Sequence, residues 1–338
     1  MPACWIWWAW PGLSPPPRNA APPVRRTRII GIDIGGTKCA VSEWRDGRPL
    51  REHHRFATRG PAESLAEIAR VIEQLDPGRA PLCGIACGGP LDPARGVILS
   101  PPNLPGWDRV RVTAWFTRRF GGRAFLMNDA NANALAEWRF GAGRGCRSMV
   151  YLTAGTGMGA GLVLDGRLYE GACGNAGEVG HVRLAPAGPV GFHKAGSFEG
   201  FCSGGGLAQL ARFLPAAQRP RRPAAWLARH PTALDIARAA RAGDRTARAV
   251  FAESGRRFGE ALAMIIDTLN PERIVIGSLW LRCRDLLGPE MRRVLRAEAL
   301  PASLRACRIV PSRLGERIGN FGAVAVALHG LGRLDRAK

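Results

Sequence analysis

The stretch Ile29-Ile30-Gly31-Ile32-Asp33-Ile34-Gly35-Gly36-Thr37-Lys38-Cys39-Ala40-Val41 decides the fold. Its β-branched apolar residues predict two strands on either side of a glycine turn. Gly35 and Gly36 let the backbone turn tightly and approach a ligand closely, and consecutive N–H groups in such a turn suit phosphate oxygens. Asp33, near the end of the first strand, is placed to order metal-bound water. Taken alone, the stretch fits a glycine hairpin capped by an aspartate equally well.

The same pattern occurs a second time. Residues 148–164 again give a strand, a glycine turn at Gly155-Thr156-Gly157 and a strand. Each copy is followed by Asp-Gly-Arg, at 46–48 and 165–167, which is a hairpin signal. Two equivalent hairpins predict two related sheets that face each other across a cleft. Two opposed glycine turns can hold one polyphosphate from both sides, so the duplication strengthens the evidence of a single glycine loop.

Length and composition set the outer limits. The chain has 338 residues, enough for about two domains. No apolar run approaches the roughly 18 residues of a membrane span, so we expect no membrane partner. The nine cysteines are scattered without a Cys-x-x-Cys pair, which argues against a zinc ribbon or a disulfide framework. Reduced thiols predict a cytoplasmic protein.

The net charge is +21 and the pI about 11.2. Such a balance raises nucleic acid or polyphosphate as a partner. However, only three of the 48 basic residues are lysines. Much of the arginine falls on polar faces of helical stretches at 233–242 and 247–257, without interleaved aromatic residues. We therefore predict an arginine bias in composition and expect no nucleic-acid partner.

Residues 1–27 differ from the rest of the chain. They combine a tryptophan cluster at 5–10 with proline runs at 15–17 and 22–23. There is no basic start followed by an apolar core, so a secretory signal is not expected. Proline-rich sequence predicts a disordered N-terminal extension. The alternative is that the tryptophans contact a membrane interface or a partner.

Strands and helices alternate along the remaining chain. Further strands are predicted at 50–56, 82–87, 125–128, 273–277 and 308–310, and helices at 62–75, 130–140, 207–214, 232–242, 245–269 and 322–328. This alternation predicts an α/β protein in two layered domains.

Chemistry-bearing residues lie at the ends of these elements. Gly88-Gly89-Pro90 follows a strand at its carboxyl end, where open sheets bind ligands. Asn128-Asp129 lies at a strand-to-helix junction, where an aspartate is often only a helix cap. Its place just before the second glycine turn favours Asp129 as a general base for a hydroxyl.

Glu178, His181 and Glu199 follow the second hairpin. Glu178 and His181 are three residues apart, so they share a face on a helix or tight turn. Glu199 lies beside a glycine-rich segment. Carboxylates and an imidazole clustered in loops suit a polyol, which needs both donors and acceptors.

Over roughly residues 28–335 these motifs resemble the ROK family of sugar kinases, of the bacterial glucokinase type. The two glycine turns are similar to its phosphate motifs, Asn128-Asp129 to its catalytic pair, Glu178-Val179-Gly180-His181 to its sugar motif, and residues 270–277 to its segment beside the adenosine. The resemblance implies the two-domain, ribonuclease H-like fold of the actin-like ATPases, with an interdomain cleft. It implies a smaller α/β domain of 28–128 plus about 319–338, and a larger one of 129–318.

The resemblance also implies roles for single residues. Asp129 would take the proton from a hexose hydroxyl, the 6-hydroxyl in a glucokinase. Sugar contacts would come from Gly89, Asn103, Asn128, Glu178, His181 and Glu199. Contacts to ATP and its Mg²⁺ would come from Asp33, Gly35, Gly36, Thr37, Lys38, Gly155, Thr156, Gly157 and Gly277. Homodimers are common in the family, so a homodimer is expected.

One departure from the family concerns zinc. Many members carry three zinc-binding cysteines after the histidine, and here those positions hold Val190, Phe192 and Ser197, while Gly196 and Glu199 remain. A structural zinc site needs thiolates. We therefore predict no zinc, with apolar packing of Val190 and Phe192 in its place.

Three alternatives stay open. The first is another hexose in place of glucose, since fructose, mannose and N-acetylhexosamines differ by one or two contacts. The family includes transcriptional repressors, which we disfavour because the 27 proline-rich residues before the first strand do not fit a DNA-reading helix and Asp129 is retained. The third alternative is polyphosphate as the phosphoryl donor in place of ATP, which only the positive charge suggests.

Overall fold

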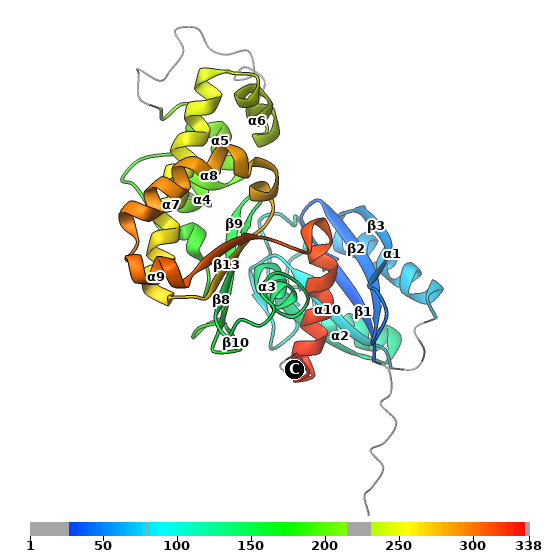
Figure 1. Cartoon of the computed structure of the whole chain (residues 1–338). Helices are drawn as coiled ribbons and strands as arrows, with labels where there is room; N and C mark the ends of the chain where they lie inside the picture. Colours follow the sequence, from blue (N-terminus) through cyan, green and yellow to red (C-terminus); the bar gives the residue numbers. More distant parts are fainter. Residues whose placement is uncertain (1–26, 77, 79, 215–230, 335–338) are drawn as a thin grey trace, which may run out of the picture.

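Two five-stranded sheets organise the molecule (Figure 1). The computed structural model describes residues 27–76, 78, 80–214 and 231–334, so the predicted N-terminal extension lies outside it except for Thr27. The first sheet has the order β3-β2-β1-β4-β7 and the second the order β10-β9-β8-β13-β14. The first contains β1 (Arg28–Ile34), β2 (Lys38–Arg45), β3 (Arg51–Ala57), β4 (Leu82–Cys87) and β7 (Arg123–Asn128). The second contains β8 (Met149–Ala154), β9 (Met158–Leu164), β10 (Arg167–Tyr169), β13 (Arg273–Ile276) and β14 (Arg308–Pro311).

The two sheets have the same topology. In each, the first three strands run antiparallel as consecutive hairpins, and two later strands add in parallel on the other side of the first strand. The predicted pair of related sheets is confirmed. The duplicated hairpin was visible in the sequence because both glycine turns and both Asp-Gly turns repeat.

Helices cover both faces of each sheet, and two helices lie between the sheets (Figure 1). Helices α1 (Pro61–Gln74) and α2 (Val112–Phe120) pack on the outer face of the first sheet. Helices α3 (Asp129–Phe140) and α10 (Ile318–Gly330) pack on each other between the sheets. The second sheet is covered outside by α4 (Phe198–Cys202), α5 (Gly204–Leu210), α6 (Ala233–Arg241), α7 (Arg245–Leu269), α8 (Leu279–Glu298) and α9 (Pro301–Ala306).

Strand periodicity determines which side chains reach the middle. In β1, Ile30, Ile32 and Ile34 join the apolar cluster under α1 and α2, whereas Ile29 joins the cluster around α3 and α10. Successive strand residues point to opposite faces, so Asp33 shares the inner face with Ile29. Its carboxylate lies against Gly319, where an added Cβ would come within 2.0 Å of Oδ2. The alternation thus brings Asp33 to the start of α10.

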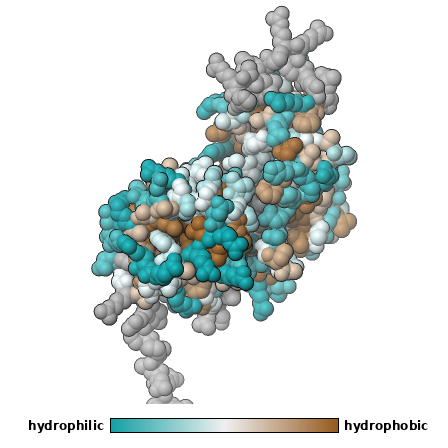
Figure 2. Space-filling view, turned by 180° about the vertical axis from the view of Figure 1, so that it is seen from behind, coloured by the Kyte–Doolittle hydropathy of each residue, from teal (hydrophilic) through white to brown (hydrophobic). Residues whose placement is uncertain are grey.

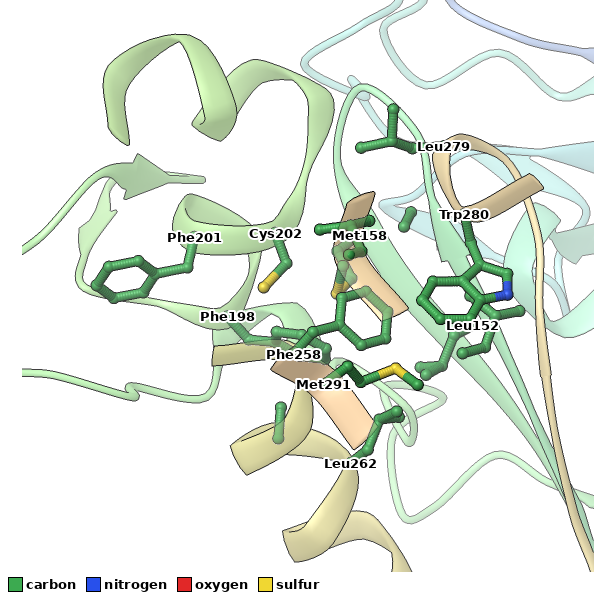
Figure 3. Close-up of a cluster of buried hydrophobic side chains, with 14 of the residues drawn as sticks. Leu152, Met158, Phe198, Phe201, Cys202, Phe258, Leu262, Leu279, Trp280 and Met291 are labelled. Atoms are coloured by element: carbon green, nitrogen blue, oxygen red, sulfur yellow. The ribbon is translucent and has the colours of Figure 1, made fainter. Parts of the chain in front are cut away.

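We call each five-stranded sheet with the helices on its outer face a lobe, the first lobe around β1 and the second around β8. The core of the second lobe includes side chains from the strands on both sides of the second glycine turn. Figure 3 shows Leu152 and Met158, from the strands on either side of this turn, packed against aromatic side chains of neighbouring helices. Phe258 of α7 stacks on Trp280 of α8 with ring centres 5.9 Å apart. A close-packed core of this kind gives the turn a rigid base.

A buried carboxylate fastens α3 to the chain leaving the second sheet. Glu137 is fully buried and accepts hydrogen bonds from Ser312 Oγ at 2.5 Å, Leu314 N at 3.0 Å and Ala142 N at 2.6 Å. Breaking such a network leaves a buried charge unpaired, which is strongly destabilising. The contact ties together segments about 175 residues apart.

Several boundaries differ from the sequence prediction. The helix expected at 207–214 is α5, which spans Gly204–Leu210. It begins earlier because Ser203 caps it, with Ser203 Oγ accepting a hydrogen bond from Gly206 N. The 20-residue helix α8 and the shorter α2, α4 and α9 were not predicted. Helix α8 carries Pro289 and is kinked at Cys283, so its apolar spacing is irregular.

Figure 2 shows the molecule from behind, with hydrophilic side chains over much of both lobes and hydrophobic ones in smaller areas between them. Among the described residues, no helix is both long and apolar enough to cross a bilayer.

Candidate active site

The first glycine turn joins β1 to β2. Gly35 N donates to Lys38 O at 3.0 Å and closes the turn. Thr58, directly after β3, supports the turn, since its Oγ1 donates to Gly35 O at 2.5 Å. A Cβ on Gly36 would lie 2.6 Å from Asn103 O, so the loop that carries Asn103 rests directly on the turn. The structure therefore brings Asn103 to the first turn.

The second glycine turn joins β8 to β9 and is closed by a bond that spans one residue fewer than in the first turn. Gly155 N donates to Gly157 O at 2.9 Å, and Gly204 N donates to Gly155 O at 2.8 Å. Met158 N donates to Glu199 Oε2 at 2.9 Å. A Cβ on Gly157 would lie 2.9 Å from the same carboxylate oxygen. Glu199 is therefore a direct brace of the second turn, a contact that the sequence did not reveal.

Asp129 is the first residue of α3, and its neighbour performs the capping. Asn128 Oδ1 accepts hydrogen bonds from Ala130 N at 2.9 Å and Asn131 N at 3.4 Å. The Asn128 Nδ2 group lies 3.5 Å from where a Cβ on Gly89 would be. The capping interpretation of Asp129 is therefore wrong, because the cap belongs to Asn128.

Two half-buried carboxylates, Asp33 and Asp129, lie close enough for their charges to interact. Burial, followed by the nearby charge of Asp129, raises the pKa of Asp33 to about 7, although the cations Lys38 and Arg55 act in the opposite direction. Burial also raises the pKa of Asp129, and backbone N–H groups offset part of this effect. Two carboxylates whose charges repel each other favour a proton or a metal ion at their site.

Glu178, His181 and Glu199 complete the cluster. Glu178 precedes a short 3₁₀ helix, η1 (Val179–His181), so the predicted tight turn that joins it to His181 is confirmed. The surrounding protein raises the pKa of Glu178, the charge of His181 lowers it, and the charges of Asp129 and Glu199 raise it. Charge interactions therefore connect Asp33 with Asp129, and Glu178 with both Asp129 and Glu199. They link the residues beside the first glycine turn to those beside the second.

The remaining predicted residues lie around the second turn or at the first. Ser278 Oγ contacts Thr153 Oγ1 at 3.2 Å and lies 3.7 Å from the Cβ position of Gly155. Gly277 precedes it, and a Cβ there would come within 2.5 Å of Tyr151 Oη. Residues 277–278 therefore border the second turn. Lys38 and Thr37 are exposed at the first turn, as is Thr156 at the second.

The expected apolar packing of Val190 and Phe192 is wrong. Val190 is 46% exposed and Phe192 50% exposed. The segment is held by polar contacts instead: Ser197 Oγ caps α4 through Gly200 N at 3.1 Å, and Gln209 bonds both the N–H and the carbonyl of Val190. Within the described ranges, no cluster of three or more His, Cys, Asp or Glu side chains has the geometry of a metal site.

The arrangement was compared with known proteins. The model of the ROK family matches residues 29–329. The chain belongs to the ROK family. It is 33% identical to a glucokinase of Thermotoga maritima over 319 residues, which covers 91% of this chain and 99% of that protein. It is 29% identical to a xylose repressor of Caldicellulosiruptor bescii, covering 89% of this chain and 78% of that protein.

Among solved structures, the chain is similar to a ROK family glucokinase from Streptomyces griseus in complex with glucose and AMPPNP, with a TM-score of 0.70, 29% identity, and coverage of 89% of this chain and 98% of that chain. The fold is that of the actin-like ATPases, as the sequence predicted. The glucokinase relatives support a sugar kinase, within a family that also contains a protein named as a repressor.

Proposed function

We propose that this ROK protein transfers the γ-phosphoryl group of ATP to a hydroxyl of a hexose, glucose first among them, with Asp129 as the general base. The observation that carries the proposal is the position of the Asp129 carboxylate at the start of α3. Asn128 caps the helix, and the charge of Asp129 acts on both Asp33 and Glu178, which belong to opposite sides of the candidate site.

The chemistry follows from the surroundings of Asp129. A general base works best when its pKa lies near the working pH, and burial raises the pKa of Asp129 in that direction. Asp129 accepts the hydroxyl proton as the sugar oxygen bonds to the γ-phosphorus, and the bond from that phosphorus to the β-phosphate oxygen breaks to release ADP. The favoured hydroxyl is the one at C6.

The sugar would lie between two walls. Glu178, His181 and Glu199 offer acceptors and a donor on the side of the second lobe. Asn103, the Nδ2 group of Asn128 and the backbone of Gly89 lie on the side of the first lobe. Such a mixed set suits a polyol, and a missing hydroxyl leaves a buried polar group unpaired, which is costly.

The nucleotide phosphates would lie between the glycine turns. The amides of Gly35 and Gly155 close the turns, so the amides available for phosphate oxygens are those of Gly36 and Thr37 on one side and Thr156 and Gly157 on the other. Lys38 supplies a positive charge at the first turn, and Gly277 borders the second. The close approach at Gly36 and Gly157 requires residues without a Cβ.

The carboxylate pair fits a magnesium ion. Oxygen ligands, largely water, are what Mg²⁺ prefers, and the raised pKa of Asp33 marks a buried carboxylate that a cation would neutralise. Asp33 would hold the waters of the ion, whose chemistry when bound is to neutralise charge on the transferring phosphates.

The proposal is tested with a panel of hexoses, with ATP and Mg²⁺, and with Asp129→Asn. We expect kcat to fall by about 10²- to 10⁴-fold while sugar binding, measured by calorimetry, survives. Asp165→Asn is the control, since Asp165 is exposed in the β9–β10 turn. Full activity of Asp129→Asn, or a wild type that binds DNA at physiological salt and phosphorylates no sugar, contradicts the proposal. Polyphosphate in place of ATP identifies the donor in the same assay.

A further inference from the structure

A short hairpin follows His181, made of β11 (Val190–Gly191) and β12 (Lys194–Ala195). Its two turn residues, Phe192 and His193, both have positive φ, 39° and 63°. This backbone costs free energy for residues with a Cβ, and a two-residue turn of this form favours Asn-Gly. Such strain persists only where surrounding contacts hold it, and it gathers at functional sites.

The first of these contacts is made by Phe192. Its ring meets the His181 imidazole edge-on, with ring centres 5.0 Å apart and planes at 84°. Half of the Phe192 side chain is exposed, so burial of the ring explains little of its position. An edge-to-face contact sets the plane of the partner ring. The strained turn therefore places Phe192 where it restrains His181.

The second contact is made by Lys194. Its Nζ donates to the main-chain carbonyl of His181 at 2.8 Å, in a partly buried position. Only three of the 48 basic residues are lysines, so arginine is the usual residue at positions of this chain that need a positive charge. The ammonium is a compact donor that reaches a single carbonyl, whereas a guanidinium is a wide planar fork. Lys194 therefore fits a task that depends on shape.

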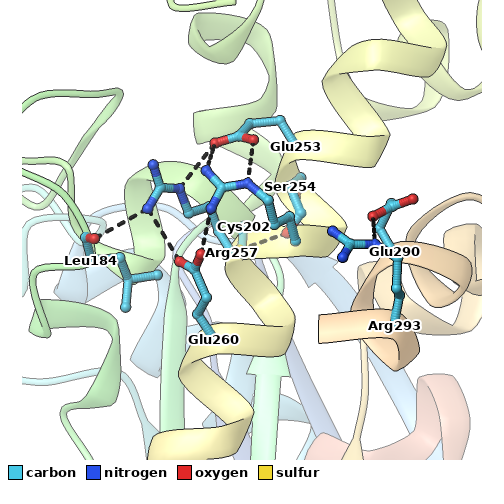
Figure 4. A network of polar contacts seen from close by, with 9 residues as sticks. Leu184, Cys202, Glu253, Ser254, Arg257, Glu260, Glu290 and Arg293 are labelled. Carbon is cyan, nitrogen blue, oxygen red and sulfur yellow. Dashed lines mark hydrogen bonds and ion pairs between the residues drawn. The ribbon is translucent and has the colours of Figure 1, made fainter. Parts of the chain in front are cut away.

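The backbone after His181 is fastened from other sides as well. Leu184 N and Ala185 N donate to Gly196 O at 2.8 and 3.1 Å. Figure 4 shows Arg257 of α7 reaching the carbonyl of Leu184, at 3.2 Å, while it pairs with Glu253 and Glu260. These contacts hold the backbone of the segment. The imidazole itself interacts with the Phe192 ring of the hairpin and with the charge of Glu178.

We propose that Lys194 and Phe192 are positioning residues for His181. Lys194 fixes the His181 carbonyl and Phe192 fixes the plane of the ring, so that the imidazole presents one nitrogen to a hydroxyl of the acceptor sugar. The inference rests on the proposed function, in which His181 bonds that sugar. A ring already held in its bound orientation loses less freedom when the sugar arrives.

The decisive variant is Phe192→Asn combined with His193→Gly, which gives the turn its preferred residues and removes the ring. We expect an equal or higher melting midpoint, and a KM for the sugar raised roughly five- to tenfold, with the KM for ATP unchanged. A purely structural role predicts that the better turn preserves the KM for the sugar. An unchanged value, with an equal or higher midpoint, overturns the proposal.

Lys194→Met keeps the length of the side chain and removes the donor. We expect the KM for the sugar to rise roughly fivefold, and Lys194→Arg to restore only part of it. Arg183→Met is the matched control, because Arg183 Nη1 also donates to a carbonyl of the hairpin, Ala195 O at 2.6 Å, without contacting the His181 ring. Equal effects of Lys194→Met and Arg183→Met overturn the role of Lys194.

Nuclear magnetic resonance of the imidazole separates this inference from the proposed function. The chain has six histidines, and the His181 signals are those lost in His181→Asn. We expect one sharp set in the wild type, and shifted or broadened signals in the turn variant and in Lys194→Met. If the wild type phosphorylates no sugar, the proposed function fails while this measurement still applies. Unchanged His181 signals in both variants overturn the proposal.

Discussion

The two glycine turns occupy the same place in their sheets but differ in length and in what supports them. Each is closed by one N–H to carbonyl bond, Gly35 to Lys38 and Gly155 to Gly157. Backbone atoms of the Asn103 loop press on the first turn. The carboxylate of Glu199 braces the second. The first turn is therefore supported by the Asn103 loop and the Thr58 hydroxyl. The second is supported by Gly204 N and by a carboxylate that also belongs to the proposed sugar site.

The two turns are connected to different parts of the proposed site. Asp33 lies at the end of the strand before the first turn, close to Asp129, and its pKa is raised. Glu199 joins the second turn to Glu178. We infer that the first turn serves the site of the charged phosphates, and that the second turn is coupled to the site of the acceptor sugar.

Alanine at each turn gives the largest expected contrast. In Gly36→Ala the new Cβ meets the backbone oxygen and the Cβ of Asn103 at 2.6 and 2.8 Å, and in Gly157→Ala it meets the end of Glu199 at 2.9 Å. A side-chain end yields more easily than backbone. We expect kcat/KM to fall about 100-fold for Gly36→Ala, by analogy with a small misplacement, and about tenfold for Gly157→Ala.

Steady-state kinetics with both substrates measures this contrast. Gly60→Ala is the control, because a Cβ at Gly60 meets nothing within 4 Å. Equal losses at the two turns, or a larger loss at Gly157, would show that the supports are equivalent.

Glu199→Gln tests the brace itself. A charge-assisted hydrogen bond is about twice as strong as a neutral one, so we expect the KM values for sugar and for ATP to rise together, each roughly fivefold. Glu272→Gln is the matched control. Its carboxylate accepts Arg147 N at 2.7 Å and Ser148 N at 3.0 Å at the other end of β8. An effect of Glu199→Gln on one substrate alone argues against the coupling.

The pH dependence of stability tests the raised pKa of Asp33, which lies just before the first turn. The pKa of Asp33 is about 7 in the folded protein and near 3.8 when unfolded. The folded form therefore holds a proton that the unfolded form has lost, so stability from this group is greatest below pH 4 and declines as the pH rises to 7. We expect Asp33→Asn to raise the melting midpoint of the ligand-free protein by roughly 2–4 °C at pH 8, and by less at pH 5. A gain that is equal at both values contradicts this account.

The smallest effect concerns zinc near the second turn. Because the hairpin after His181 is held by Lys194 and by backbone bonds, we expect a chelator to shift the melting midpoint by less than about 1 °C, since a ligand that is not bound adds no stability. Elemental analysis of the purified protein provides the second measurement. Stoichiometric zinc would refute the prediction.

Much of the fold was predictable because its signals are local. The β1–β2 and β8–β9 turns, strand β4 and helix α7 follow from glycine positions, apolar runs and helical spacing, and their predicted bounds agree with the structure. Helix α8 escaped because Pro289 and the kink at Cys283 break its periodicity.

The candidate site was predictable as a set of residues but not as a geometry. Asp33, Asp129 and Glu178 stand out by position and motif, yet nothing local indicates that Glu199 bonds Met158, 41 residues away. The exposure of Phe192 was likewise missed, because an apolar residue type in place of a metal ligand suggested burial. Contacts between distant segments depend on how the two sheets and their helices assemble.

The buried bond network of Glu137 has a mechanical consequence. It bonds Ser312 and Leu314, which follow β14, to α3. We therefore expect the end of β14 and helix α3 to move together. We infer that a rotation of the two sheets against each other would bend the chain at the junction where α3 begins and at the segment η4 (Gly315–Arg317), where Gly315 has a φ of 56°. Asp129 lies at the first of these points, so such a rotation would move the proposed base relative to the first glycine turn.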